Sequence, residues 1–228
     1  MLPLILNIDT ALERAIISLS EGGKMLDYIE SNDQKSHASI LHSAINTLLK
    51  KFGLKPSNLD AIGLSIGPGS YTGLRVGMAA AKGLCYALKI PIINIGTLEL
   101  LASNAIYCCK NDEATYCPMI DARRMEVYTA LYDHQLKEIL PPSAVILSEN
   151  LFEEELENRK VVFFGSGALK FKKTVQKDNY LFENIDIDPQ TMVRLAIEKF
   201  RNKEYVFSLH DQPLYIKEFY TISSGKKE

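Results

Sequence analysis

The sequence lacks an excess of charge of either sign. Its 228 residues include 26 Lys and Arg against 28 Asp and Glu, which gives a formal net charge of -2 and a pI near 6.1. A chain with this balance has no overall field that would attract nucleic acid or an anionic membrane. Any RNA partner must therefore be bound locally, or jointly with another chain.

Long apolar runs and paired cysteines are also missing. No apolar run reaches the roughly 20 residues that a membrane-spanning helix needs. The segment from Met1 to Asp9 lacks a basic region and a cleavage site, so it reads as a buried strand rather than a signal peptide. The 4 cysteines include no C-x-x-C pair, and the adjacent Cys108 and Cys109 are poor disulfide partners. These absences predict a cytoplasmic protein with reduced thiols and no membrane segment.

Hydrophobic residues make up 46% of the sequence, enough for a core in one large domain or in two smaller ones. Three β-rich segments open the chain with turns between them, which predicts an antiparallel meander. After Ser36 the apolar residues recur at helical spacing. The expected elements of the first half are strands 4–8, 15–19, 25–31, 61–66 and 91–95, helices 36–52 and 72–88, and a helix that begins at Thr97.

The second half of the chain repeats the pattern of the first. Ile8-Asp9 and the strand that follows line up with Ile120-Asp121 and its following strand. The strand that turns through Gly67-Pro68-Gly69 has a counterpart that turns through Gly165-Ser166-Gly167. Two correspondences in the same order suggest a duplicated unit, and chance similarity between two βα domains is the alternative.

The halves meet without a linker or a low-complexity segment. A polar stretch near residues 108–113 suggests a first lobe over 1–108 and a second over 109–228, whose C-terminal segment could pack back on the first lobe. Two further helices are expected in the second lobe. Ser148 can cap a helix over 150–156, and Asp188 with Pro189 can begin one over 190–200.

Residues 65–77, SIGPGSYTGLRVG, are rich in glycine. They are no Walker loop, because no lysine follows Gly73 or Gly77, and their glycine spacing does not fit the dinucleotide-binding fingerprint. A strand, a flexible turn and a helix N-terminus with free N–H groups remain. Such a terminus could hold an anion, and a tight strand-to-helix turn is the alternative.

The helix expected after this loop has small residues along one face. Small side chains let another helix approach closely, from this chain or from a partner. The helix expected at 36–52 has a polar face that is almost without charge. Together these faces predict a protein interface, unless they pack on each other inside the fold. The candidate interface residues are Ser39, His42, Ser43, Asn46, Gly73, Gly77, Ala80 and Ala81.

Four segments together resemble one protein family. They are Asn7-Ile8-Asp9-Thr10, GPGSYTGLRVG at 67–77, Asp121-Ala122-Arg123 with Glu126-Val127-Tyr128, and Pro213-Leu214-Tyr215. The two units that begin with an Asp resemble the duplicated architecture of the actin and sugar kinase superfamily. The resemblance implies an α/β fold of two RNase H-like lobes, which are two copies of a βββαβα unit with mixed sheets flanked by helices. Within that superfamily the segments are similar to the TsaB family, also called YeaZ, over nearly the whole chain.

This resemblance implies a scaffold role in forming N6-threonylcarbamoyladenosine in tRNA. The partners it implies are a TsaD-like transferase subunit and a TsaE-like ATPase, with tRNA contacted indirectly and no membrane. In the family, docking uses a bundle of the two helices after the first sheet, here residues 36–52 and 72–88. The same surface could form a homodimer when the partner is absent, because an exposed pair of helices can pack against the same pair of a second copy.

The residues give little support for catalysis by the chain alone. The turns after Asp9 and Asp121 contain no glycine, so they are too bulky for a tight phosphate wrap. The 4 histidines include no pair four residues apart of the kind that TsaD-like proteins carry. We expect no metal site and no tightly bound cofactor, with ATP, ADP or Mg²⁺ only at a junction with a partner. The candidate anion or nucleotide contacts are Asp9, Thr10, Gly67, Gly69, Ser70, Thr72, Asp121 and Arg123.

Two other functions remain open at this point. One is an enzyme, either a phosphotransferase of the sugar kinase type or a metallopeptidase of the glycoprotease type. The other is a chaperone or binding module for a different kinase-like protein. A separate question is whether Lys170, Lys172, Lys173 and Lys177 are ordinary solvated residues or contact phosphates of RNA in a larger assembly.

Overall fold

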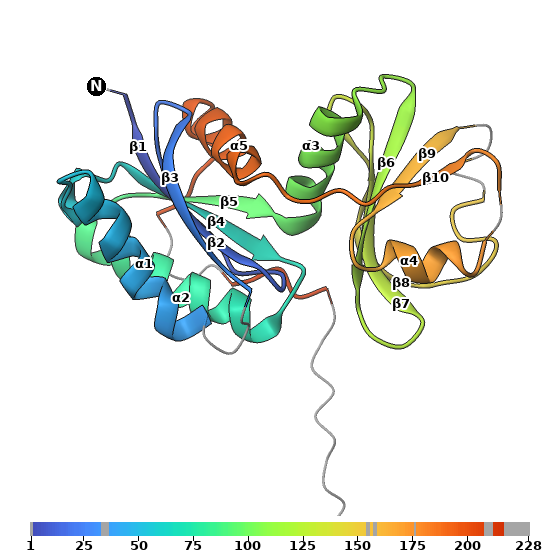
Figure 1. Cartoon of the computed structure of the whole chain (residues 1–228), viewed down its shortest axis with the longest axis horizontal. Helices are drawn as coiled ribbons and strands as arrows, with labels where there is room; N and C mark the ends of the chain where they lie inside the picture. The colour runs from blue at the N-terminus through green and yellow to red at the C-terminus, as the bar shows by residue number, and fades with distance from the viewer. Residues whose placement is uncertain are drawn as a thin grey trace, which may run out of the picture.

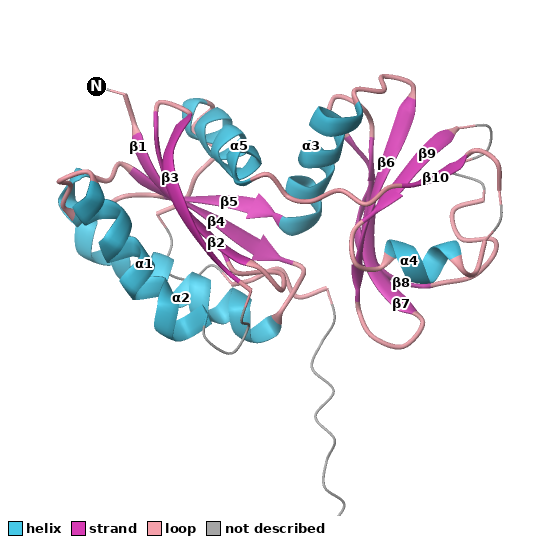
Figure 2. Ribbon diagram, viewed as in Figure 1, coloured by secondary structure: helices cyan, strands magenta, loops and turns pink. Residues whose placement is uncertain are grey.

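The chain folds into two α/β lobes that lie side by side (Figure 1). The computed structural model describes residues 2–32, 37–153, 156, 159–175, 177–207 and 212–216. Each lobe is built on one five-stranded sheet, and helices pack against the faces of these sheets (Figure 2). The predicted class of two RNase H-like lobes is confirmed.

The first sheet has the strand order β3-β2-β1-β4-β5. Its strands are β1 (Leu4–Asp9), β2 (Ala15–Glu21), β3 (Lys24–Ser31), β4 (Ala61–Gly67) and β5 (Ile92–Gly96). The pairs β1–β2 and β2–β3 are antiparallel, whereas β4 pairs parallel with β1 and with β5. The expected meander of three strands is therefore confirmed.

Helices cover both faces of the first sheet (Figure 1). On one face lie α1 (His37–Lys51) and α2 (Tyr71–Leu88), and on the other lies α5 (Pro189–Arg201). The helix α3 (Thr97–Cys109) contacts strands of both sheets and α5, so it joins the lobes. A short 3-10 helix, η2 (Pro56–Asn58), precedes β4.

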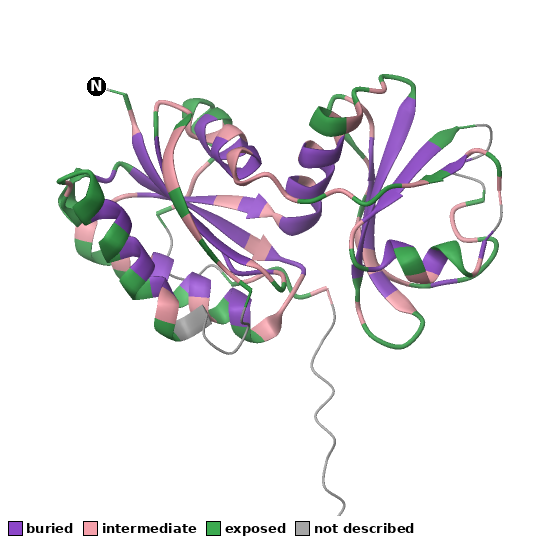
Figure 3. Cartoon of the chain, in the orientation of Figure 1, coloured by how far each residue is buried: buried purple, intermediate pink, exposed green. Residues whose placement is uncertain are grey.

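The central strand β1 shows why this arrangement needs an apolar sequence. Every residue of β1 is buried. Successive side chains of a strand point to opposite faces, so Leu6 and Ile8 pack in the core under α1 and α2, while Ile5 packs under α5. Figure 3 shows the resulting buried interior between the helices and the sheet. A strand covered on both faces must be apolar along nearly its whole length.

The second sheet has the order β10-β9-β6-β7-β8. Its strands are β6 (Ala114–Asp121), β7 (Glu126–Tyr132), β8 (Glu138–Ile146), β9 (Lys160–Phe164) and β10 (Tyr180–Phe182), and the helix α4 (Ala168–Lys172) packs on it. Here again three antiparallel strands are followed by two parallel ones. Because β6 takes the place of β1 and β9 that of β4, the predicted duplication is confirmed.

The two expected late helices have different outcomes. The Asp188 side chain accepts a hydrogen bond from Gln190 N at 2.9 Å, and α5 begins at Pro189, as predicted. The helix expected over 150–156 is wrong for the described part of that segment, which forms turns. Phe152 has a φ of 61°, which lies outside the right-handed helical region and interrupts any helix there.

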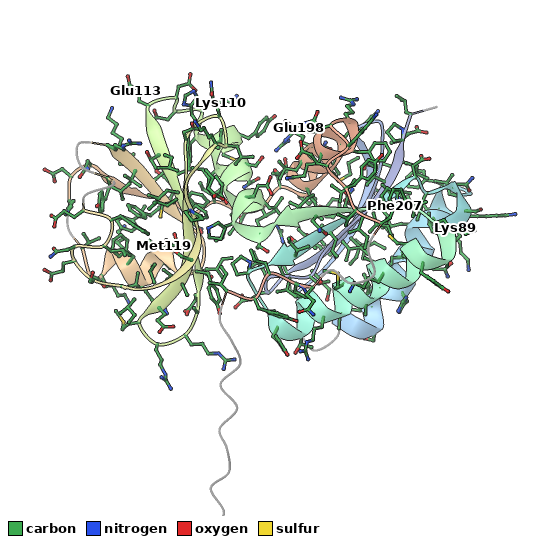
Figure 4. The ribbon with its side chains drawn as sticks, turned by 180° about the vertical axis from the view of Figure 1, so that it is seen from behind. Lys89, Lys110, Glu113, Met119, Glu198 and Phe207 are labelled. Atoms are coloured by element: carbon green, nitrogen blue, oxygen red, sulfur yellow. The ribbon has the colours of Figure 1, made fainter. Side chains whose placement is uncertain are left out.

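The C-terminal part of the chain returns to the first lobe. Val206 exchanges two backbone hydrogen bonds with Ile92 of β5, at 2.8 and 2.9 Å. The neighbouring Phe207, labelled in Figure 4, lies on this lobe. Further along, Leu214 N donates to Ile66 O at 2.7 Å. Residues 206 and 214 are thus attached to β5 and to β4, and β4 is the strand that leads into the glycine-rich loop.

Candidate functional site

A cleft of about 2090 Å³ is lined by turns of both lobes. The first lobe contributes residues 11–14 and 68–72, and the second contributes residues 120–124, 165–166 and 168–170. The C-terminal residues 214–216 also line it. Of the candidate anion contacts, the cleft brings together Gly69, Ser70, Thr72, Asp121 and Arg123. Asp9, Thr10 and Gly67 do not line it.

Asp9 and Thr10 lie inside the first lobe. The Asp9 side chain is 2% exposed, and its Oδ1 accepts hydrogen bonds from Ala11 N at 3.1 Å and Ser65 Oγ at 2.6 Å. Thr10 is fully buried, and its Oγ1 donates to Gly73 O at 2.8 Å. Both side chains therefore fix the turn after β1 against its neighbours, and neither is presented to the cleft.

The glycine-rich loop packs closely against this same turn. A Cβ added at Gly69 would lie 2.2 Å from Ala11 O, so only glycine allows this approach. Ser70 N donates to Ala11 O at 2.7 Å, and Ser70 Oγ accepts from Gly73 N at 3.3 Å as the N-cap of α2. These contacts fit the strand-to-helix turn. Anion binding by the loop stays a prediction.

The equivalent turn of the second lobe is organised by a lysine. Asp121 Oδ1 accepts from Arg123 N at 2.7 Å and from Lys170 Nζ at 2.6 Å. The Lys170 ammonium lowers the pKa of the Asp121 carboxyl below its ordinary value, although burial acts in the opposite direction. This lowered pKa stabilises the fold above the unfolded-state pKa, and the stabilisation is lost as pH falls through the folded-state pKa. The effect is small, because the Asp121 side chain is 44% exposed.

The polar face predicted for α1 is exposed. Ser39, His42, Ser43 and Asn46 all lie at the surface of this helix. Its first side chains and residue Ser36, where the helix was expected to begin, lie outside the described residues. The structure thus shows that these four residues are exposed, and their role in an interface stays a prediction.

The small residues predicted for the same interface on α2 are buried instead. Ala80 is 8% exposed, Gly73 and Ala81 are buried, and a Cβ added at Gly77 would lie 2.5 Å from Thr10 Oγ1. Their assignment to a partner interface is corrected, because this face of α2 packs on its own sheet and turn.

The outward face of α2 carries a second set of mostly small residues. Its exposed positions are Thr72, Arg75, Ala79, Gly83, Tyr86 and Ala87. A Cβ added at Gly83 would meet no atom within 4 Å, and Tyr86 is 73% exposed. We therefore define the docking face as this set together with Ser39, His42, Ser43 and Asn46 of α1, and its contact with a partner stays a prediction.

Sequence reasoning missed an aromatic cluster at the rim of the cleft. The Tyr71 and Tyr215 rings lie 5.2 Å apart, and the Arg75 guanidinium lies 3.8 Å from the centre of the Tyr71 ring. Arg75 Nε also donates to Tyr215 Oη at 3.2 Å. The only signal in the sequence was that Pro213-Leu214-Tyr215 belonged to the same resemblance as the loop.

The described residues offer no metal centre. Among them, no three His, Cys, Asp or Glu side chains come together in a group that could hold a metal ion. His210 lies outside the described part of the chain. In the same part of the chain, no helix combines the length and apolar content that crossing a membrane requires.

Comparisons with known proteins agree with the geometry. Residues 28–198 match the family model of TsaD, tRNA N6-adenosine threonylcarbamoyltransferase. The chain is 34% identical over 176 residues to the tRNA threonylcarbamoyladenosine biosynthesis protein TsaB of Bacillus subtilis. The aligned region covers 75% of each chain. It is 25% identical to TsaB of Escherichia coli over 220 residues, 93% of this chain and 94% of that protein.

Solved structures show the same fold. YeaZ from Pseudomonas aeruginosa superposes with a TM-score of 0.78 at 24% identity, over 93% of this chain and 99% of that one. Since the Bacillus subtilis relative shares more than 30% identity over three quarters of both chains, the chain belongs to the TsaB family, also called YeaZ.

Proposed function

We propose that this chain is a non-catalytic scaffold subunit in the formation of N6-threonylcarbamoyladenosine in tRNA. It binds and activates a TsaD-like transferase subunit, and a TsaE-like ATPase completes the assembly. The observation that carries the proposal is the 34% identity to a protein named for this biosynthesis, over 75% of both chains. A cytoplasmic location belongs to the same proposal.

The local geometry supports a scaffold better than an enzyme. Asp9 is buried and already accepts two hydrogen bonds that hold its turn. Asp121 faces a lysine ammonium at 2.6 Å, where a divalent cation would meet a charge of its own sign. The phosphotransferase and metallopeptidase alternatives each need reactive groups that these side chains do not supply. The chain matches a model named for a transferase, but its sequence lacks the paired histidines expected of TsaD-like proteins.

The docking face on α1 and α2 is the surface that we assign to the partner. It is exposed, weakly charged and built mostly from small residues on α2, which allow a partner helix to approach closely. In isolation the same face could pair two copies of this chain. A nucleotide would bind only where the partner completes a site, and tRNA would be held mainly by the assembled complex.

Reconstitution tests this function. The purified chain is combined with the TsaD-like and TsaE-like proteins of the same organism, tRNA, ATP, threonine, bicarbonate and the enzyme that makes the threonylcarbamoyl adenylate. Mass spectrometry of digested tRNA is expected to detect the modified nucleoside when this chain is present and only background without it. The transferase is expected to need this chain because the active arrangement of the transferase forms only in the complex.

Three results would contradict the proposal. Full modification without this chain would remove the need for a scaffold. ATP or peptide turnover by the chain alone, lost in Asp9→Ala, would favour one of the enzyme alternatives. Stable capture of a different kinase-like protein instead of the transferase would favour a chaperone or binding module.

A further inference from the structure

The turn between β6 and β7 displays two adjacent arginines at the cleft. Arg123 and Arg124 have φ angles of 66° and 50°, a left-handed conformation that arginine seldom adopts. Both residues are exposed and both line the cleft. Two such residues in succession need support from the surrounding structure.

Lys170 supplies that support from beneath the turn. Its Nζ donates to Asp121 Oδ1 at 2.6 Å, to Arg124 O at 2.6 Å and to Glu126 O at 3.3 Å. These three acceptors use all three donors of the ammonium group. Lys170 therefore fixes the backbone of the turn and pairs with its carboxylate, which leaves Asp121 less able to attract the two guanidinium groups.

In the part of the chain that the structure describes, the two arginine side chains have no acidic partner of their own. Within the described residues, neither Arg123 nor Arg124 forms a side-chain hydrogen bond or an ion pair. Lys172 lines the same cleft and has an aromatic contact, with its Nζ 5.8 Å from the centre of the Phe182 ring, but no ion pair in the described structure. Glu183 and Asp186 also line the cleft, and neither pairs with these three cations. The rim thus holds cations that are available to an external anion.

We propose that Arg123 and Arg124, with Lys172, bind the phosphodiester backbone of RNA. Guanidinium groups form paired hydrogen bonds to phosphate oxygens, and a short run of cations can contact successive phosphates. The cleft is also lined by Tyr71 and Tyr215. Because the Arg75 guanidinium already lies over the Tyr71 ring, Tyr215 is the ring on which an unpaired base can stack. Cations beside aromatic rings suit a single-stranded stretch of RNA better than a lipid surface. The inference rests on the proposed function, which brings tRNA to the complex.

The test compares two double variants with the same change in charge and backbone. Arg123→Gly with Arg124→Gly removes both guanidinium groups and suits the positive φ angles. Lys110→Gly with Lys203→Gly is the control, because these residues also have positive φ angles, of 49° and 62°. Lys110 lies at the far end of α3 from the cleft (Figure 4). Binding of tRNA by the assembled complex is measured across a range of salt concentrations.

We expect the arginine variant to bind tRNA about ten-fold more weakly at low salt. The logarithm of the association constant for tRNA, plotted against the logarithm of the salt concentration, should have a slope that is less steep by about 1 to 2. Each lost phosphate contact reduces the magnitude of this slope by about 0.7 to 0.9. Arg123→Lys with Arg124→Lys should recover most of the slope, and the control variant should match the unaltered complex.

Unchanged affinity and slope in the arginine variant would overturn this inference. So would an equal loss in the control variant, or failure of the arginine variant to assemble with the transferase while its melting temperature is normal. The last result would indicate that the rim contacts an acidic protein surface. In each case the unaltered complex still modifies tRNA if the proposed function holds. The experiment therefore distinguishes failure of the RNA-binding inference from failure of the proposed scaffold function.

Discussion

Gly73→Ala is expected to destabilise the protein by about 3 kcal/mol. The added Cβ would lie 2.0 Å from Thr10 O, far closer than the two atoms can approach. Thr10 is fully buried and its Oγ1 hydrogen-bonds Gly73 O, so the turn cannot move aside without breaking its own contacts. Urea unfolding followed by circular dichroism measures the change.

Gly83→Ala is the matched substitution on the same helix. No atom lies within 4 Å of the added Cβ, and alanine favours a helix interior over glycine by about 0.5–1 kcal/mol. This variant should therefore be slightly more stable than the unaltered chain. An equal loss of stability in both variants would contradict this account, because it would show that the close contact between α2 and the Thr10 turn does not hold α2 in position.

The second large effect is expected at the docking face. Ala79→Arg should weaken binding to the TsaD-like subunit by about 100-fold, because a long charged side chain at the centre of a close helix contact prevents that contact. Ala79 is exposed in the isolated chain, so the fold should be unaffected. Isothermal titration calorimetry of the purified subunits measures the affinity.

Gln135→Arg provides the control for this variant. Gln135 is exposed in the turn between β7 and β8, on the other lobe from α2. It introduces the same side chain away from the docking face, and we expect full affinity. Normal binding by Ala79→Arg, or an equal loss in both variants, would show that the partner contacts another surface.

The orientation of α2 illustrates what the sequence could and could not specify. Its approximate limits and its small residues followed from composition and spacing. However, α2 carries two rows of small residues, one through Gly73, Gly77 and Ala81 and one through Ala79 and Gly83. Both rows have helical period and both permit close approach. Spacing alone does not determine which row packs on the sheet, because this depends on where the Thr10 turn lies in space.

Contacts between distant parts of the chain were also beyond sequence reasoning. Lys170 looked like one of several surface lysines, but the duplicated fold places its ammonium 2.6 Å from Asp121. The duplication could be predicted from the repeated Asp and glycine turns, because these mark the same step of the fold in each lobe. Which side chain fills the space beside each Asp depends on the tertiary structure: Ser65 in the first lobe and Lys170 in the second.

Hydrogen exchange tests the central claim most directly. Amide exchange of this chain is measured by mass spectrometry, alone at a concentration where it is monomeric and again with saturating TsaD-like subunit. A scaffold that docks through α1 and α2 predicts slower exchange confined mainly to residues 39–50 and 72–87 of these helices. Slower exchange at α5 or on the second lobe with no change in α1 and α2, or no change anywhere, would contradict it.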